Sequence, residues 1–482
     1  MILLYLLGIT WFGARFRHTQ HSLKDYFLGG KNAPWWAIAF SIVSAETSTL
    51  TIIGTPAIAF DGNLGFLQVV IGYLFARVLI SLLFLPQYFR GEMFTAYELM
   101  RRRFGQNIRK LTAGSFLVLR ALAEGVRVFA ISIVISIILG TGEMASIALI
   151  VALTLFYTFE GGMTAVIWTD VIQMFLYVAG ALVSFVVILN SIPGGWPHVQ
   201  QVAGDLGKFQ LFDFRFEMTA EFFARPYSFW AGVIGGLFLT TASHGTEQLM
   251  VQRLLAARTQ NESRLALFAS WFVIFFQFSL FLMIGLMLFV YYKDTGQPPP
   301  TPHDRIYPQF IWQKLPVGVA GLIVAAVLAA AMSNLSAALN SLASTTIMDF
   351  YRPAAEARGE HHPEQYYLRL AKRATVFWGV VLLVIGFFAQ NWGRVLEAGL
   401  GIASVVYGSL LGVFLLGLLT KRVEERSAMT GMVGGLLTML YVKFGTSIAF
   451  TWYVLIGTSV TFGIGYLSSF FWANQPGKGA DA

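Results

Sequence analysis

Long apolar runs, separated by short polar and charged patches, extend over almost the whole sequence. A bilayer core about 30 Å thick needs about 20 apolar residues in a helix that crosses it. The pattern therefore predicts a polytopic all-α membrane protein with about 13 transmembrane helices, at residues 2–16, 34–60, 64–88, 111–139, 143–159, 163–190, 227–251, 264–293, 315–350, 372–391, 394–419, 427–443 and 448–472. The first run is too short to cross fully, and we interpret it as a helix whose start is missing from the chain.

Composition supports this interpretation and excludes several classes of protein. Of the 482 residues, 56% are hydrophobic and only 12% are charged, whereas about 25% are charged in a soluble domain. A soluble enzyme, a disordered chain and a nucleic-acid binder are therefore excluded. The chain has no cysteine, which excludes disulfides, thiolate metal sites and cysteine nucleophiles.

The basic residues predict the orientation in the membrane. If the N-terminus lies outside, most of the 33 lysines and arginines, Arg253 among them, fall in loops on the inner side. This distribution follows the positive-inside rule and places the C-terminus in the cytoplasm, as expected in a bacterial inner membrane. The outer loops 191–226 and 294–314 are expected to be partly ordered caps over an entrance.

Two of the predicted spans contain residues that a lipid-facing helix would avoid. One contains small polar residues, Gly54 and Pro56 within 44–56, and the other contains Gly235 and Gly236 followed by the polar run 240–248. Unwound backbone at membrane depth must line a cavity, and breaks at matching places in two halves point to a transporter site. The alternative is a pair of kinks packed against small neighbours.

The ninth predicted span has a polar stripe along one face. Its residues recur at i, i+3 and i+4 spacing: Ala330, Ser333, Asn334, Ala337, Asn340, Ser341 and Ser344. Hydroxyl and amide oxygens can bind a hard cation, but small residues at this spacing also form tight helix seams. The sequence leaves both interpretations open.

Ionisable residues inside the predicted spans carry a sharper signal, because each costs about 2.5–3.5 kcal/mol at the centre of a membrane helix. Glu46 and Glu247 lie at the two breaks, and Asp170 lies in the sixth span, with Gln173 one turn later. The fourth span contains the basic and acidic set Arg120, Glu124 and Arg127, and the third contains Arg77. Glu124 can pair with either neighbouring arginine, and Arg77 must pair or extend to the membrane surface.

Several motifs together resemble the sodium:solute symporter family. They are Asp25–Gly30, Gly54–Pro56, Gly161–Gln173, Thr246–Arg253, Met332–Ser336, Met348–Tyr351, and Gly412–Gly417 before Lys421 and Arg422. The resemblance implies one transporter domain, 1–482, with a LeuT-type inverted repeat of five plus five helices and broken first and sixth core helices. Its parts would be an extra first helix (1–33), two repeats (34–190 and 227–419) and two final helices (427–472).

The resemblance also implies a sodium site between the first and eighth core helices. The backbone carbonyls of Ser44, Thr47 and Ala330 and the side-chain oxygens of Ser333 and Asn334 would bind the ion. The family usually has serine or threonine where this chain has Asn334. A second sodium site or a coupling role would involve Asp170, Gln173, Ser48 and Ser336, but Ala337 replaces the second hydroxyl of that site, so we expect one sodium per cycle.

By the same resemblance, the substrate cavity would be lined by Glu46, Thr51, Tyr73, His244, Glu247 and Gln248, and Arg127 would bind a substrate carboxylate. Guanidinium groups bind carboxylates through two parallel hydrogen bonds. We therefore expect an amino acid, a sialic acid or another organic acid as substrate, with sodium/sugar symport as the alternative.

The resulting hypothesis is sodium-coupled import by alternating access, in a monomer embedded in lipid and without an organic cofactor or enzymatic activity. Sodium would be a transported ion. A membrane-embedded enzyme would need a catalytic pair such as His244 and Glu247. A sensor would need an output domain, whereas the sequence ends soon after its last apolar run. Proton coupling through Glu46 or Asp170 is the alternative within the transporter class.

Overall fold

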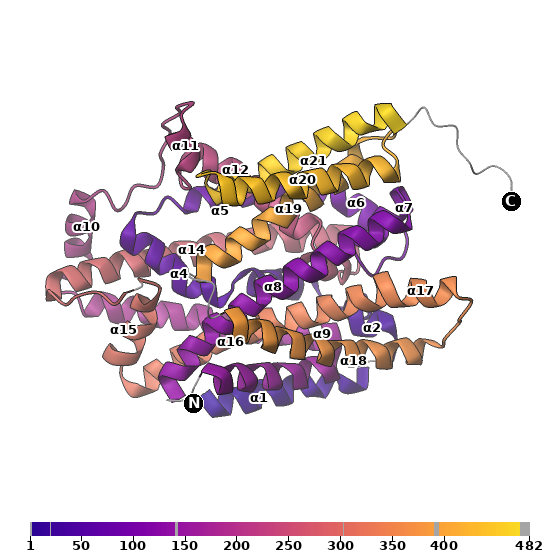
Figure 1. Cartoon of the computed structure of the whole chain (residues 1–482). Coiled ribbons are helices and arrows are strands. Elements are labelled where there is room, and N and C mark those ends of the chain that lie inside the picture. The colour runs from indigo at the N-terminus through magenta and orange to yellow at the C-terminus, as the bar shows by residue number, and fades with distance from the viewer. Residues whose placement is uncertain (1, 20, 140–142, 302, 390–394, 473–482) are drawn as a thin grey trace.

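The computed structural model describes residues 2–19, 21–139, 143–301, 303–389 and 395–472. Within these ranges the secondary structure is helical, apart from one isolated bridge between Ala33 and Ala257. Most of the long helices run in roughly the same direction, as expected for a bundle that crosses a membrane (Figure 1). The helices form the bundle of a multi-pass membrane protein.

The first half of the chain contains the elements α1 to α11. Their bounds are α1 Ile2–Ala14, α2 Leu23–Leu28, α3 Trp35–Glu46, α4 Thr49–Asp61, α5 Leu67–Leu79, α6 Leu85–Tyr88, α7 Tyr97–Arg103, α8 Gln106–Leu139, α9 Glu143–Asn190, α10 Gly195–Asp205 and α11 Ala220–Ala224. A π-helical turn, Ile80–Phe84, joins α5 to α6. Helix α9 is bent at Gly162, whose φ of 54° is unfavourable for residues with a side chain.

The second half contains the elements α12 to α21. Their bounds are α12 Phe229–Gly245, α13 Gln248–Leu255, α14 Gln260–Thr295, α15 Ile306–Lys314, α16 Val317–Thr345, α17 Arg352–Ala357, α18 Glu364–Ala389, α19 Val395–Leu419, α20 Glu425–Gly445 and α21 Phe450–Trp472. Each of the thirteen predicted spans coincides with one of these helices, a helix pair or one half of α9. The spans 372–391 and 394–419 extend partly outside the described residues.

Length and composition identify fewer membrane-crossing helices in the described residues than the sequence pattern predicts. In the described part of the chain, eight helices are long and apolar enough to cross, or nine if the bent pair α3 and α4 counts as one span. Several of the other predicted spans are shorter, such as α12, or carry charges, such as α8. The number thirteen therefore stays a prediction.

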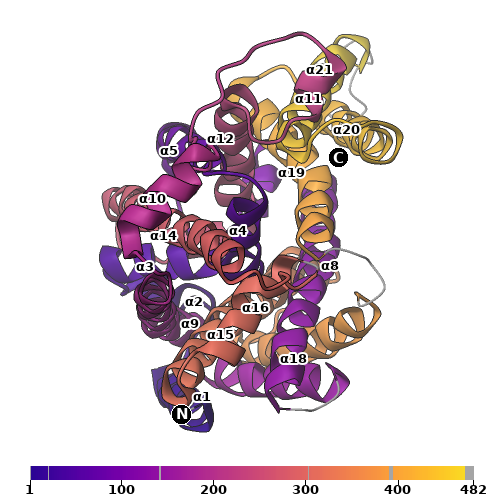
Figure 2. The same cartoon turned by 90° about the vertical axis from the view of Figure 1, so that its left-hand side faces the viewer.

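Helix α16 lies at the centre of the bundle, surrounded by α4, α8, α9 and α18 (Figure 2). In the most apolar stretch of the segment Val317–Ala357, 94% of the residues are buried, against 33% in α20 and α21. The polar stripe of α16 therefore faces other helices and not lipid. This position allows hydroxyl and amide groups at membrane depth, because protein partners satisfy them.

Glycines allow α12 to pack closely against α5. A Cβ atom on Gly236 would lie only 2.1 Å from the carbonyl oxygen of Val69, and one on Gly235 would lie 2.6 Å from that of Thr451. These two glycines lie inside a continuous helix. The prediction that they belong to the unwound segment is wrong, because they permit close helix packing, and the break itself follows at Thr246 and Glu247.

Both of the loops that the sequence predicts on the outer side contain ordered structure. The first includes α10 and α11, and the second includes α15. Lys208 anchors the first loop, since its Nζ donates to the carbonyl oxygens of Phe60 at 2.7 Å and Gly62 at 3.0 Å. These carbonyls are at the C-terminal end of α4, where a helix leaves its last acceptors without intrahelical donors. Lys208 thus ties a loop to one half of a broken helix.

Candidate functional site: the break between helices α3 and α4

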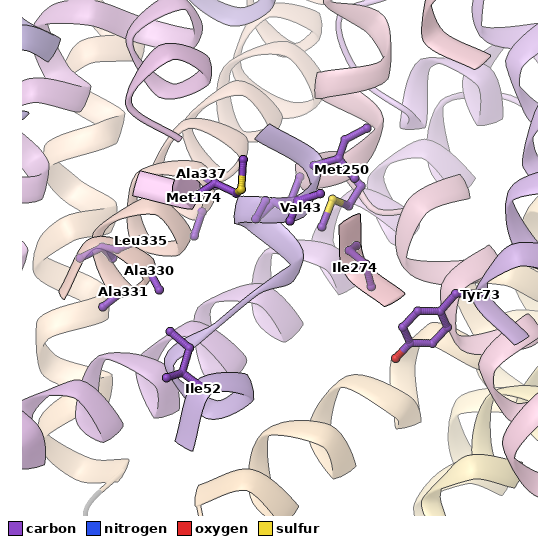
Figure 3. Close-up of a cluster of buried hydrophobic side chains, with 14 of the residues drawn as sticks. Val43, Ile52, Tyr73, Met174, Met250, Ile274, Ala330, Ala331, Leu335 and Ala337 are labelled. Carbon is purple, nitrogen blue, oxygen red and sulfur yellow. The ribbon is translucent and has the colours of Figure 1, made fainter. Parts of the chain in front are cut away.

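The central feature of the site is a break of two residues between α3 and α4. The axes of the two helices differ by 64°, and the intervening Thr47 and Ser48 have extended backbone. Ser48 caps α4, because its hydroxyl accepts a hydrogen bond from the backbone N–H of Thr51 at 3.3 Å. Figure 3 shows Val43 and Ile52 on either side of the break, with Ala330 on the neighbouring α16. The break exposes carbonyl oxygens in the protein interior.

Asn334 of α16 contacts these exposed carbonyls directly. Its Nδ2 donates to the carbonyl oxygens of Thr47 at 2.5 Å, Ser44 at 3.3 Å and Ala330 at 3.3 Å. The hydroxyls of Ser44 and Ser333 are 2.7 Å apart beside them. The structure therefore brings together all five residues predicted for the sodium site. It differs from the prediction in one respect, since the amide nitrogen of Asn334, and not its oxygen, faces the carbonyls.

Asp170 of α9 lies behind this group and links it to α13. Its carboxylate accepts from the hydroxyls of Ser333 at 2.6 Å and Ser41 at 2.5 Å. Nη2 of Arg253 donates to the same carboxylate at 2.8 Å, and Nε donates to Ser41 at 2.9 Å. All four side chains are buried. Asp170 is thus ion-paired, and its oxygens position a hydroxyl of the candidate ion site.

The other residues predicted for a second ion site do not join Asp170. Gln173 donates from Nε2 to the hydroxyl of Tyr5 in α1 at 3.0 Å. The hydroxyl of Ser336 donates to the carbonyl oxygen of Ser333 at 2.9 Å, and Ser48 serves as the cap of α4. In this conformation each of the three has a contact within its own helix or with a neighbour.

Glu46 is held at the end of α3 by two basic groups. Nη2 of Arg77 lies 3.0 Å from its carboxylate, and Nε2 of His244 lies 3.2 Å away. Arg77 is fully buried and also donates from Nη1 to the carbonyl oxygen of Tyr73 at 3.2 Å. Arg77 is therefore paired inside the protein and does not extend to the membrane surface. His244 and Tyr73, two predicted substrate residues, lie in this cluster.

A second buried cluster forms along α8. Arg120 bridges two carboxylates, those of Glu124 at 2.8 Å and Glu247 at 3.1 Å, and Tyr407 of α19 also donates to Glu247. Arg127 lies 3.1 Å from Glu124, with 25% of its side chain exposed against 4% for Arg120. Glu124 therefore pairs with both neighbouring arginines, Arg120 and Arg127.

Arg127 also contacts the candidate ion site. Its Nη1 donates to Oδ1 of Asn334 at 3.4 Å. The carboxamide of Asn334 thus lies between the guanidinium of Arg127 and the backbone carbonyls at the break. In the described part of the chain no group of three or more histidine, cysteine, aspartate or glutamate side chains could hold a metal ion. The oxygen donors at the break are carbonyls and hydroxyls, which suit a weakly held monovalent cation.

Gln248 lies apart from these clusters. Its side chain bonds the backbone of Phe94 at 2.9 Å and Ala96 at 2.8 Å, in the segment before α7. Sequence analysis missed three residues of the site, Ser41, Arg253 and Tyr407. Arg253 was expected in an inner loop, which is wrong, because the structure buries it against Asp170. Its position inside the motif Thr246–Arg253 was a signal that could have identified it.

Comparison with known proteins gives a consistent picture. The sodium:solute symporter family model matches residues 26–435. The chain is 28% identical over 481 residues to the sodium/sialic acid symporter NanT of Aliivibrio fischeri, covering 98% of this chain and 92% of that protein. It is 28% identical over 466 residues to the sodium/sialic acid symporter SiaT of Proteus mirabilis, covering 94% and 91%. The mouse sodium-coupled monocarboxylate transporter 2 is 27% identical, with 92% and 70% covered.

Solved structures agree with these relationships. The substrate-bound outward-open state of a Na+-coupled sialic acid symporter superposes with a TM-score of 0.88 at 26% identity, covering 98% of this chain and 97% of that one. Mhp1, a nucleobase-cation-symport-1 family transporter, shares the fold with a TM-score of 0.62 at 13% identity, covering 92% and 93%. The fold is therefore of the LeuT type. Because the family model matches residues 26–435, more than four fifths of the sequence, the chain belongs to the sodium:solute symporter family.

Proposed function

We propose that the chain is a sodium-coupled symporter that imports a small organic solute carrying a carboxylate. The observation that carries the proposal is the juxtaposition of two features through Asn334. One is the oxygen-rich break between α3 and α4, and the other is the partly exposed guanidinium of Arg127. A cation and a carboxylate are the ligands that these two features would bind.

Arg127 is the residue we expect to select the substrate. It is the more exposed of the two arginines in its cluster, and its planar donors fit both oxygens of a carboxylate. The relatives named above include symporters for sialic acid and for monocarboxylates, which are both carboxylates. A neutral sugar is not favoured, because it has no group that would match this cation.

In the proposed cycle, sodium enters from outside and binds the carbonyls of Ser44, Thr47 and Ala330 together with the hydroxyl of Ser333. This binding holds the break between α3 and α4 against α16 and favours an outward-open cavity. Substrate then binds near Arg127, and the bundle rocks to release both to the cytoplasm. We propose that one sodium moves per cycle, in a monomer with an external N-terminus and a cytoplasmic C-terminus in a bacterial inner membrane.

The named relatives are all transporters, and we propose that this chain has no enzymatic activity. The one catalytic pair considered from sequence would be His244 and Glu247. In the structure His244 contacts Glu46, whereas Glu247 contacts Arg120 and Tyr407. The two side chains thus belong to different clusters, and neither is positioned as a nucleophile activated by the other.

The experiment is uptake into proteoliposomes with an inward sodium gradient or an equal gradient of choline. Radiolabelled N-acetylneuraminate, pyruvate, amino acids and glucose would be tested separately. We expect sodium-dependent accumulation of a carboxylate. Ser333→Ala should raise the sodium concentration at half-maximal uptake, and Ser191→Ala, at the exposed turn after α9, should not.

Arg127→Lys tests the carboxylate assignment, because lysine keeps the charge but cannot make two parallel hydrogen bonds. We expect KM for the carboxylate to rise about tenfold, as for the loss of about 1.4 kcal/mol of binding. Accumulation that needs no sodium, or that is driven by a proton gradient alone, would contradict the proposed coupling. Glucose uptake with an unchanged KM in Arg127→Lys would contradict the proposed substrate class.

A further inference from the structure

The carboxamide of Asn334 connects the two parts of the proposed site. At one end, its nitrogen donates to the three carbonyl oxygens of Thr47, Ser44 and Ala330. At the other end, its oxygen accepts from Nη1 of Arg127. Asn334 itself is 1% exposed. A single rigid, planar group therefore contacts both the oxygens proposed to bind sodium and the cation proposed to bind substrate.

The nitrogen of this group occupies a position that suits a cation. Three carbonyl oxygens converge on it, although a carboxamide has only two N–H groups to donate. A sodium ion at the same oxygens would need a further oxygen ligand, and the N–H groups of Asn334 would be repelled by its charge. The carboxamide would therefore have to turn over. This rotation costs little in packing, because the oxygen and nitrogen of an asparagine side chain are nearly equal in size.

Turning the carboxamide would also change the contact with Arg127. The oxygen would move to the ion, and the N–H groups would face the guanidinium, which has donors only. Two donors cannot form a hydrogen bond, so the contact between Arg127 and Asn334 would be lost. The N–H of Nη1 that donated to Oδ1 of Asn334 could then donate to a substrate carboxylate, while the contact of Arg127 with Glu124 remains.

We propose that Asn334 is a two-position relay that couples sodium binding to substrate binding. Without the ion, its nitrogen bonds the carbonyls at the break and its oxygen holds Arg127. Sodium turns the carboxamide and releases Arg127 to the carboxylate. Coupling of this kind is reciprocal, so substrate bound to Arg127 also favours the orientation that accepts sodium. The inference rests on the proposed function, since it assigns sodium and a carboxylate to these two places.

The first test uses sodium alone. Thermal unfolding of the full-length protein in detergent would be measured over a range of sodium chloride concentrations, with N-methylglucamine chloride keeping ionic strength constant. Arg127→Gln weakens the bond that holds the oxygen of Asn334, so half-maximal stabilisation should need about fivefold less sodium, as for the loss of one hydrogen bond. Asn334→Ser removes the competing N–H groups and keeps an oxygen. This variant should need about tenfold less sodium for half-maximal stabilisation.

The matched control is Asn340→Ser on the same helix. Asn340 is also buried, but its Nδ2 contacts Sδ of Met163 at 3.4 Å and not the carbonyls at the break. This variant should reach half-maximal stabilisation at the same sodium concentration as the unmodified protein, even if its melting temperature falls. A purely structural role for Asn334 would make its variant resemble this control. Such a result would overturn the relay.

The second test measures binding of N-acetylneuraminate at low and high sodium by calorimetry. In the unmodified protein, affinity should rise at least tenfold with sodium. In Asn334→Ser it should be nearly independent of sodium, because Arg127 keeps its contact with Glu124 but loses the carboxamide that links it to the ion site. In Asn334→Asp the carboxylate keeps Arg127 paired, so sodium should bind more tightly while N-acetylneuraminate binds weakly at every sodium concentration. Equal sodium dependence in the unmodified protein and Asn334→Ser would overturn the relay.

The relay and the proposed function fail in different ways. In one outcome, sodium stabilises the unmodified protein and drives uptake, but Arg127→Gln and Asn334→Ser need as much sodium for stabilisation as the unmodified protein does. The relay is then wrong, and the proposed sodium-coupled transport still holds. If sodium neither stabilises the unmodified protein nor drives uptake of any solute, the sodium coupling itself is wrong. The relay then falls with it, because no ion turns the carboxamide.

Discussion

Breaking the ion pair between Asp170 and Arg253 should strongly destabilise the protein. The atoms Oδ2 and Nη2 are 2.8 Å apart, and the two side chains are 0% and 1% exposed. With an effective dielectric constant of about 20, opposite unit charges at this distance attract by about 6 kcal/mol. Much of this attraction offsets the loss of hydration, but removing one partner leaves the other charge buried alone, which costs about 3–5 kcal/mol.

The test is a double-mutant cycle read by thermal unfolding in detergent. Asp170→Asn and Arg253→Met should each lower the melting temperature by about 5–10 °C, because each leaves one unpaired buried charge. The double variant should be more stable than either single variant, since it contains no such charge. Glu221→Gln is the control, because it removes an exposed ion pair with Arg225, and exposed ion pairs contribute little to stability.

Two results would refute this reasoning. One is a single substitution at Asp170 or Arg253 that changes the melting temperature no more than Glu221→Gln does. The other is a double variant whose loss equals the sum of the two single losses, which would mean that the residues act independently. Even with stability restored, the double variant should need more sodium for uptake, because Asp170 also orients the hydroxyl of Ser333.

Two further predictions concern the packing of the bundle. Gly236→Ala should sharply reduce the yield of monodisperse protein in size-exclusion chromatography, because the new methyl group would lie 2.1 Å from the carbonyl oxygen of Val69; Gly318→Ala, where nothing lies within 4 Å, should behave as the unmodified protein does. Lys208→Met should lower the melting temperature by several degrees, because two carbonyls at the end of α4 lose their donor. Lys293→Met, at an exposed position, should have little effect, and an equal loss in both lysine variants would contradict the capping role.

The sequence predicted the helix breaks because their residues are out of place in lipid. Glu46 and Ser48 in one apolar run, and Glu247 in another, cannot be accommodated by a simple membrane helix. Gly54 and Pro56, which the sequence also suggested for the first break, lie inside α4. The fold class followed from the same pattern together with the family motifs. Gly236 misled the analysis, because glycine marks both unwound segments and close helix contacts, and only the position of α5 distinguishes the two.

Charge patterns alone could not place Arg253. A basic residue at the end of an apolar run is typical of an inner loop, and the partner that buries it, Asp170, is 83 residues away in the chain. Likewise, the sequence identified Asn334 as an oxygen donor but could not tell which end of its carboxamide faces the break. That orientation depends on how α16 lies against α3 and α8, which is a property of the assembled bundle.

The buried clusters also determine how the protein responds to membrane voltage. In the clusters described at the candidate site, carboxylates and guanidiniums are equal in number: Asp170 with Arg253, Glu46 with Arg77, and Glu124 and Glu247 with Arg120 and Arg127. The charges of these carboxylates and guanidiniums sum to zero, and adding one sodium ion and one carboxylate leaves the sum at zero. Moving one unbalanced charge across the membrane changes the energy by about 2.3 kcal/mol per 100 mV. A cycle that moves one sodium and one monocarboxylate carries no net charge and would produce no current, so a measured current would count the additional ions.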